Sequence, residues 1–251
     1  MEKIRFARFF STDSAKAIKA DKFGFINGIN YMAPDDTGST KEKYFKLCSD
    51  STPGCRALCL GWYSGQAAMV DNLETGTNSV RDSRIRKAQY FMTERRAFMT
   101  EMTWHVRKLA KQAAKQNKGL VIRPNGSTDV AFERVPAENG KPLPIVFPLV
   151  EFVDYTKNLA RLLSKTKPDN YHLTFSLSET NHDKARQALK AGFNVAVVFG
   201  HGLPKKYFGH DVIDGTLHDL RQLDPSPVIV GLDPKGAKAK NDTTGFVVRD
   251  Y

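Results

Sequence analysis

The feature that most constrains the fold is a regular alternation of apolar runs and helix-like segments in the second half of the chain. The apolar runs have the length of strands, and segments with helix-capping residues separate them. Strands that are apolar on both faces and alternate with helices form parallel sheets covered by helices. We therefore expect five parallel strands of one sheet, with helices on its outside, starting within 120–123, 151–155, 171–177, 194–199 and 228–232.

The fold class predicted from this pattern is α/β, built as a complete or partial parallel βα barrel in a single domain over 1–251. The chain has 251 residues, of which 41% are hydrophobic, and no break in composition divides it. That is enough apolar material for one large core. A short strand at 212–214 adds a further unit. A doubly wound open sheet is the alternative, because it uses the same strand–helix units.

The first half of the chain predicts an entry segment followed by a long helix. Strands are expected within 1–33, at 4–10 and 23–29, and a cysteine-bearing loop is expected at 44–65. A single helix over 82–116 follows from apolar residues at spacings of three, four and seven.

Composition favours a cytoplasmic protein without a membrane segment. No apolar run approaches the roughly 18 residues that span a bilayer, and the first residues lack the apolar core of a secretory signal. The three cysteines are an odd number, whereas secreted domains usually pair their cysteines.

The cysteines are the sharpest candidate for a site. Cys48, Cys55 and Cys59 lie within 12 positions, at spacings of six and three intervening residues, and the chain has no others. Thiolates suit zinc and iron–sulfur clusters. Three of them leave one iron of a four-iron cluster open, where a substrate or cofactor can chelate. One alternative is zinc, with His105 as a fourth ligand brought in by folding. The other is three thiols that are neighbours by chance and bind no metal.

Basic charge is concentrated in the expected helix. Between Arg81 and Lys118 there are 11 basic residues and three acidic ones, and the whole chain carries +11. Such a stripe predicts a polyanion partner such as nucleic acid, and nearby aromatic residues, including Trp104, could add stacking. An ordinary solvated helix face is the alternative. The residues assigned to nucleic acid are Arg84, Lys87, Arg95 and Lys108.

Polar residues follow each expected strand, where parallel βα folds place their active sites. For any one of them, a helix-capping role explains the residue equally well. Phosphate-binding glycine loops and the nucleophile elbow of hydrolases are absent. The strand-end residues are Arg123, Asn125, Ser127, Asp129, Asp154, Tyr155, Thr156, Lys157, Ser176, Ser178, Glu179, Asn181, His201, Asp214, His218, Asp219, Asp233 and Lys235.

Six ordered motifs resemble the bacteriophage proteins called the gene product 88 family. They are RPNGSTD at 123–129, DYTK at 154–157, FSLSE at 175–179, NVAVVF at 194–199, VIDG at 212–215 and VGLDPKG at 230–236. The cysteine segment and strand–helix order of that family are similar to radical S-adenosylmethionine enzymes. Those enzymes usually space their three cysteines by three and two residues, and this chain spaces them by six and three.

The resemblance implies an iron–sulfur enzyme of the radical S-adenosylmethionine kind, acting on nucleic acid or nucleotides. Cys48, Cys55 and Cys59 would hold a [4Fe-4S] cluster, and S-adenosylmethionine would chelate its open iron. The alternative function is a non-catalytic nucleic-acid-binding protein associated with phage replication. The remaining assignments are Asp129, Lys157 and Glu179 as catalytic residues and Asn125, Ser127, Ser176 and Ser178 as cofactor-binding residues.

Overall fold

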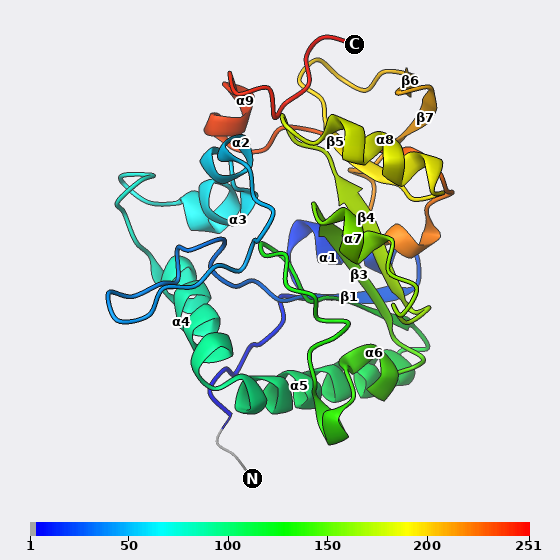
Figure 1. Ribbon diagram of the computed structural model, residues 1–251. Helices are drawn as coiled ribbons and strands as arrows, with labels where there is room; N and C mark the ends of the chain where they lie inside the picture. The colour runs from blue at the N-terminus through cyan, green and yellow to red at the C-terminus, as the bar shows by residue number, and fades with distance from the viewer. Residues whose placement is uncertain (1–3) are drawn as a thin grey trace.

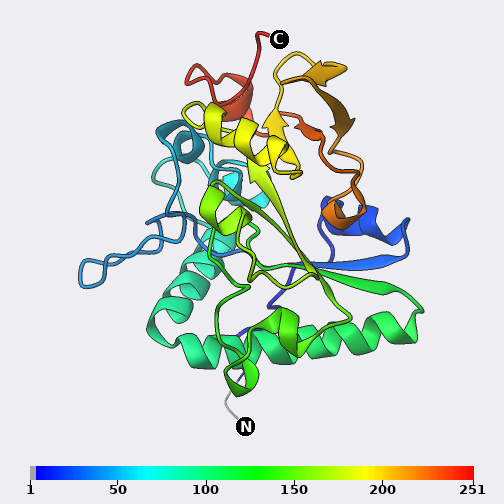
Figure 2. The same ribbon diagram turned by 45° about the vertical axis from the view of Figure 1, so that its right-hand side comes forward.

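The computed structural model describes residues 4–251, so the part of the expected entry segment at 1–3 lies outside the described residues. Figures 1 and 2 show the helices arranged around a twisted sheet. The strands are β1 (Phe25–Ile29), β2 (Gly119–Arg123), β3 (Glu151–Thr156), β4 (Tyr171–Ser176), β5 (Val195–Val198), β6 (Lys206–Tyr207), β7 (His210–Asp214) and β8 (Ile229–Leu232). The α-helices are α1 (Ala15–Asp21), α2 (Pro53–Ala57), α3 (Leu60–Tyr63), α4 (Ser79–Thr93), α5 (Arg95–Lys115), α6 (Leu143–Val146), α7 (Leu159–Leu162), α8 (His182–Lys190) and α9 (Ala237–Lys240), with 3-10 turns η1 (Gly65–Ala68), η2 (Glu138–Gly140) and η3 (Arg221–Leu223).

The predicted parallel strands are confirmed. The strands of the described residues are ordered β1-β2-β3-β4-β5-β8-β7-β6. Every neighbouring pair from β1 to β7 is parallel, and only β6 pairs antiparallel, with β7. The five strands expected after residue 119 and the short strand at 212–214 are all present.

The sheet is open, and the expectation of a complete barrel is not confirmed. Its edges are β1 and β6, which do not pair with each other in residues 4–251. The first five strands follow one another in chain order, without the reversal that marks a doubly wound sheet. The chain therefore winds in one direction through β5; beyond it the order reverses to β8, β7 and β6, and the sheet does not close.

Alternate residues of the strands face two different layers. Ile122 and Phe152 join the main core with Phe98 of α5. Val121 and Val153, one position away from Ile122 and Phe152, pack instead with Ala20 of α1. Both views show α1 and α5 on opposite sides of β1 (Figures 1 and 2). The period-two alternation thus gives one face covered mainly by the larger helices and a second, less covered face.

The strand predicted at 4–10 is wrong. The backbone amides of Arg5 and Phe6 donate to the carboxylate of Glu101, at 3.1 and 2.7 Å, instead of to a neighbouring strand. Phe9 is fully buried in the core beside α5. The alternating pattern of this segment therefore reflects anchoring to a helix through one buried acid.

The single helix predicted over 82–116 is also wrong, because it consists of α4 and α5. Glu94 leaves the helical region (φ −134°, ψ 51°) and ends one helix where the other begins. The chain turns at this point (Figure 1), so that Phe91 of α4 and Phe98 of α5 pack edge-on in the same core. A straight helix would carry part of this apolar face away from the sheet.

Within residues 4–251, no helix combines the length and the apolar character needed to span a bilayer.

Candidate active site

A cavity of about 240 Å³ lies at the carboxyl ends of the parallel strands. Its walls include residues at or just after the ends of β2, β3, β4, β5, β7 and β8, which is where α/β folds of this kind place ligands. All three cysteines line it. The strand-end residues in its wall are Arg123, Tyr155, Thr156, Lys157, Ser176, Val198, Gly215 and Leu232.

The first part of the cysteine segment is tied to the strand loops by its backbone and by Cys48 itself. The Sγ of Cys48 accepts a hydrogen bond from the amide of Asp35 at 3.3 Å and lies 3.8 Å from the carbonyl of Ser127. The amide of Asp129 donates to the carbonyl of Leu47 at 2.8 Å. These contacts hold Cys48 against the loop that follows β2.

The second part of the segment is helical rather than a loop. Thr52 caps α2 by accepting from the amide of Cys55 at 3.2 Å, and Pro53 occupies the first turn. The carboxylate of Glu179 completes the cap, because it accepts from the Thr52 hydroxyl at 2.9 Å and from the amide of Gly54 at 2.8 Å. A Cβ on Gly54 would lie 2.8 Å from the Glu179 carboxyl carbon, so only glycine permits this approach.

Glu179 was predicted to be catalytic, and the structure gives it a supporting position. Both of its carboxylate oxygens are occupied by the start of α2, and it is not among the residues that line the cavity. A negative charge at a helix N-terminus is also electrostatically favourable.

Replacing Glu179 with alanine should loosen the segment that carries Cys55. The substitution removes two hydrogen bonds to a charged group, each worth about 1.5–3 kcal/mol. We expect alkylation of Cys55 by iodoacetamide to accelerate roughly tenfold, measured by peptide mass analysis of the native protein. The matched control is Asp183→Ala, which removes a nearby carboxylate that is 96% exposed. Equal alkylation rates in both variants would contradict the supporting role.

Burial dominates the electrostatics of the thiols. It raises the pKa of Cys48 and of Cys59 to about 12, and the neighbouring Cys55 adds a smaller contribution in the same direction to both. Each of these two thiols is therefore neutral near pH 7 unless a cation lies beside it. Deprotonation by a bound metal would release protons on binding.

The three cysteines share one cavity, but no group of three or more His, Cys, Asp or Glu side chains in residues 4–251 is arranged to hold a metal ion. All three therefore lie at the carboxyl ends of the strands, without the arrangement of a single-ion site. His105, the fourth ligand considered for zinc, is buried beside Phe6 and Phe9 and does not line the cavity.

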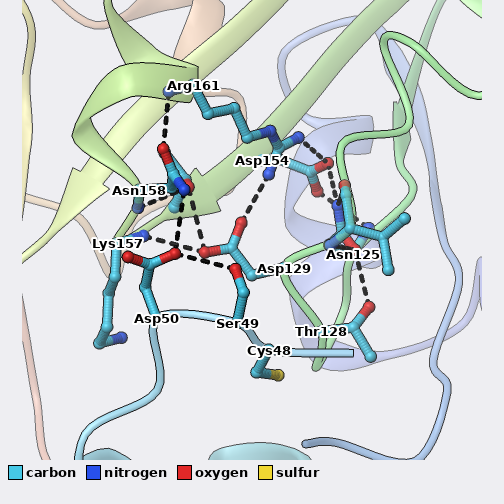
Figure 3. A network of polar contacts seen from close by, with 12 residues as sticks. Cys48, Ser49, Asp50, Asn125, Thr128, Asp129, Asp154, Lys157, Asn158 and Arg161 are labelled. Carbon is cyan, nitrogen blue, oxygen red and sulfur yellow. Dashed lines mark hydrogen bonds and ion pairs between the residues drawn. The ribbon is translucent and has the colours of Figure 1, made fainter. Parts of the chain in front are cut away.

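Lys157 places its ammonium group inside the cavity. Its Nζ donates to the Ser176 hydroxyl at 3.0 Å. Burial alone would lower the pKa of Lys157, but the neighbouring Cys55 and Asp129 raise it above its ordinary value. The side chain turns away from the polar network at its own backbone (Figure 3). A positive charge therefore lies beside the Cys55 thiol.

Asp129, also predicted to be catalytic, lines the cavity but is held by other protein groups. One of its carboxylate oxygens accepts from the Thr156 hydroxyl and the Lys157 amide, both at 3.0 Å. The other accepts from Arg161 at 2.6 Å, as Figure 3 shows. These contacts make Asp129 a link between the cavity and a buried ion-pair network.

Arg161, which sequence analysis did not single out, is the centre of that network. Its guanidinium also donates to both oxygens of Glu133, at 2.9 and 2.8 Å, and lies 3.7 Å from Asp154. Burial raises the pKa of Asp154 to about 6, against the lowering effect of Arg161 and its hydrogen bonds. An arginine on a short helix is normally exposed, so no sequence signal identified this one.

Of the four residues predicted to bind a cofactor, two line the cavity that contains the cysteines and two do not. Ser127 and Ser176 line the cavity, although the Ser127 hydroxyl donates to the carbonyl of Met32 at 2.6 Å. Asn125 and Ser178 do not line it. The amide of Asn125 is used within the protein, by Asp154, Thr128 and Val130. Ser178 is buried, and its backbone amide donates to Asn181.

Three further residues line the cavity on the side that we call its inner wall, and the sequence-based hypothesis gave them no role. They are Arg123, Tyr155 and Asp219. Arg123 donates to Asp219 at 3.2 Å, and its guanidinium lies 4.7 Å from the ring centre of Tyr155. The Tyr155 hydroxyl is buried and has no hydrogen-bond partner in residues 4–251. These residues follow strands, which the sequence indicates, but their convergence depends on the twist of the sheet.

The residues predicted to bind nucleic acid do not share one exposed face. Arg84 donates to the carbonyl of Gly61 and lies over the Tyr31 ring, and Lys87 is buried and donates to the carbonyl of Phe9. Burial lowers the pKa of Lys87 to about 8. Arg95 and Lys108 are exposed, on α5. Arg84 and Lys87 of α4 are thus used within the protein, while Arg95 and Lys108 lie beyond the break at Glu94 on α5.

The chain is similar to one known protein family. A protein-family model described as Gene product 88 matches residues 8–250. No curated protein and no solved structure gives a significant match.

Proposed function

Since that match spans nearly the whole sequence, the chain belongs to the gene product 88 family, and we propose that its cysteine-lined cavity is the active site of an iron–sulfur enzyme. The observation that carries the proposal is that every cysteine of the chain lines one cavity at the carboxyl ends of the strands. Cys48 is held against the loop after β2 and Cys55 belongs to α2, yet both line the same cavity.

The chemistry of the donor set suits a cluster better than a single ion. A zinc ion needs its sulfurs about 2.3 Å from one centre, and residues 4–251 contain no such group of ligands. In a cluster each thiolate binds a different iron, so the sulfurs stand further apart. Cys48, Cys55 and Cys59 would occupy three irons of a [4Fe-4S] cluster.

The fourth iron would have no cysteine ligand, and it is where S-adenosylmethionine would coordinate in a radical enzyme. That cofactor supplies the radical chemistry, and the protein supplies binding and orientation. Lys157 and Ser176 are the side chains best placed to hold a carboxylate, because an ammonium and a hydroxyl already meet there in the cavity. Asn125 and Ser178 are not proposed for this role.

The substrate would bind against the inner wall, next to Arg123, Asp219 and Tyr155. Arg123 and Asp219 form the polar part of this wall, and the Tyr155 ring, 4.7 Å from the Arg123 guanidinium, forms its aromatic part. The cavity volume of about 240 Å³ is below the roughly 300–1,000 Å³ usual for ligand pockets, so the substrate would be a small molecule or would enter with one end only.

The test is anaerobic reconstitution of the full chain with iron and sulfide. We expect a brown protein that absorbs near 400 nm and contains about four irons per chain, as a thiolate-bound cluster requires. A colourless protein that retains no iron would overturn the proposal. So would tight binding of one zinc per chain that prevents iron uptake.

A further inference from the structure

The outward face of α5 forms a second hollow, separate from the cysteine cavity. Its volume is about 440 Å³. In both views α5 lies at the end of the molecule away from α2 and α8 (Figures 1 and 2). The hollow is lined by Trp104, Arg107, Lys108, Lys111, Gln112 and Lys115.

The positive charge of this face is largely uncompensated. Lys108, Lys111 and Lys115 are exposed, and none of them forms an ion pair within the described part of the chain. Arg107 pairs with the exposed Glu138 at 2.6 Å. The Glu101 carboxylate of the same helix is buried against Arg5 and Phe6, so it does not neutralise the outer face.

An exposed indole lies within these cations. Trp104 is 40% exposed, and the Lys108 ammonium lies 5.6 Å from its ring centre. The His105 ring packs nearly perpendicular to the indole, with ring centroids 4.7 Å apart. An exposed aromatic ring among lysines is the combination that binds bases by stacking and phosphates by charge.

The opposite face of α5 indicates whether the anionic partner is a lipid surface or a nucleic acid. Phe98, Met102 and Val106 are buried in the core. The helix therefore has no free apolar face to insert into a lipid surface, as interfacial helices do. A duplex would offer phosphates but no unstacked base for Trp104.

We propose that the outer face of α5 binds single-stranded nucleic acid, with Trp104 stacking on a base and Lys108, Lys111 and Lys115 contacting phosphates. The proposal is independent of the cysteine cavity. It moves the polyanion site from the four residues predicted by sequence to the exposed side of one helix, retaining only Lys108.

The experiment measures binding of fluorescein-labelled oligothymidylate to the full chain by anisotropy over a range of salt concentrations. The variant reverses charge at Lys108→Glu, Lys111→Glu and Lys115→Glu. The control, Lys184→Glu, Lys190→Glu and Lys205→Glu, changes net charge equally at exposed positions outside α5. Each lost phosphate contact should reduce the salt slope by about 0.7. We therefore expect the α5 variant to bind at least tenfold more weakly at low salt, and the control to change roughly twofold or less.

Trp104 provides a second, direct readout. The chain has two tryptophans, so in a Trp62→Phe background the remaining fluorescence reports on Trp104. We expect quenching on addition of oligothymidylate, and about fivefold or greater weakening in Trp104→Leu. Equal losses in the α5 and control variants, an unquenched Trp104, or binding to phosphatidylglycerol vesicles without binding to oligothymidylate would each overturn the proposal.

Discussion

Replacing Arg161 with methionine should destabilise the protein by about 3–5 kcal/mol, the range expected when one partner of a buried ion pair is removed. The change leaves Asp129, Glu133 and Asp154 without their shared cation, and the side chains of the last two are 1% and 0% exposed. Methionine retains much of the apolar stem of arginine, so the loss reports mainly on charge. The measurement is the midpoint of urea unfolding.

The matched control for this variant is Arg134→Met. Arg134 lies 4.0 Å from the same Glu133, but its side chain is 54% exposed. Exposed pairs contribute at most about 1 kcal/mol. Similar losses of stability in the two variants would show that Arg161 is not the centre of the network.

The effect of Arg161→Met should also depend on pH. Burial already raises the pKa of Asp154 to about 6 in the presence of the arginine, and removing that cation raises it further. A carboxyl whose folded-state pKa is raised favours the folded state when protonated, and this contribution is lost as pH rises through that pKa. The variant should therefore recover part of its stability between pH 7 and pH 5.

Replacing Cys55 with serine should abolish assembly of the proposed cluster. We expect reconstituted wild-type protein to contain about four irons per chain and the variant to contain less than about one, because three thiolates are the minimum set of protein ligands here. Iron and sulfide are counted after gel filtration, and the circular dichroism of both proteins establishes that each is folded.

Ser49→Ala is the control for the cysteine variant. Ser49 lies in the same segment, but its hydroxyl donates to the side chain of Asp50 and it does not line the cavity. Its iron content should equal that of the wild type. Full iron content in Cys55→Ser would exclude the cysteine segment as the ligand set.

The parallel strands were within reach of sequence analysis because their signal is local, whereas the placement of β8 beside β5 was not predicted. Runs such as Val195–Val198 are apolar on both faces, and helices with recognisable ends separate them. Gly192, for example, ends the α8 segment with a positive φ of 87°, a conformation that glycine adopts without strain. Local rules of this kind do not decide whether a sheet closes, since closure depends on the pairing of its two edge strands.

The N-terminal half was predicted less well, because single long-range contacts override its local pattern. The alternation at 4–10 indicates a strand, yet the carboxylate of Glu101 takes the amides that a strand would use. The periodicity at 82–116 indicates one helix, yet the core is reached only if the chain turns at Glu94. The first error comes from a hydrogen-bond partner about a hundred residues away in the chain, and the second comes from the shape of the core.

For the candidate site, the sequence by itself determined which residues could carry chemistry: three clustered cysteines and a set of polar residues after parallel strands. Only the tertiary structure decided their positions. It placed Lys157 beside Cys55, used Glu179 to cap the cysteine-bearing helix, and turned Lys87 into the interior. The physical reason is that residue type and spacing report local propensity. Burial and the hydrogen-bond partner of each polar group are set by chain segments that meet only when the sheet forms.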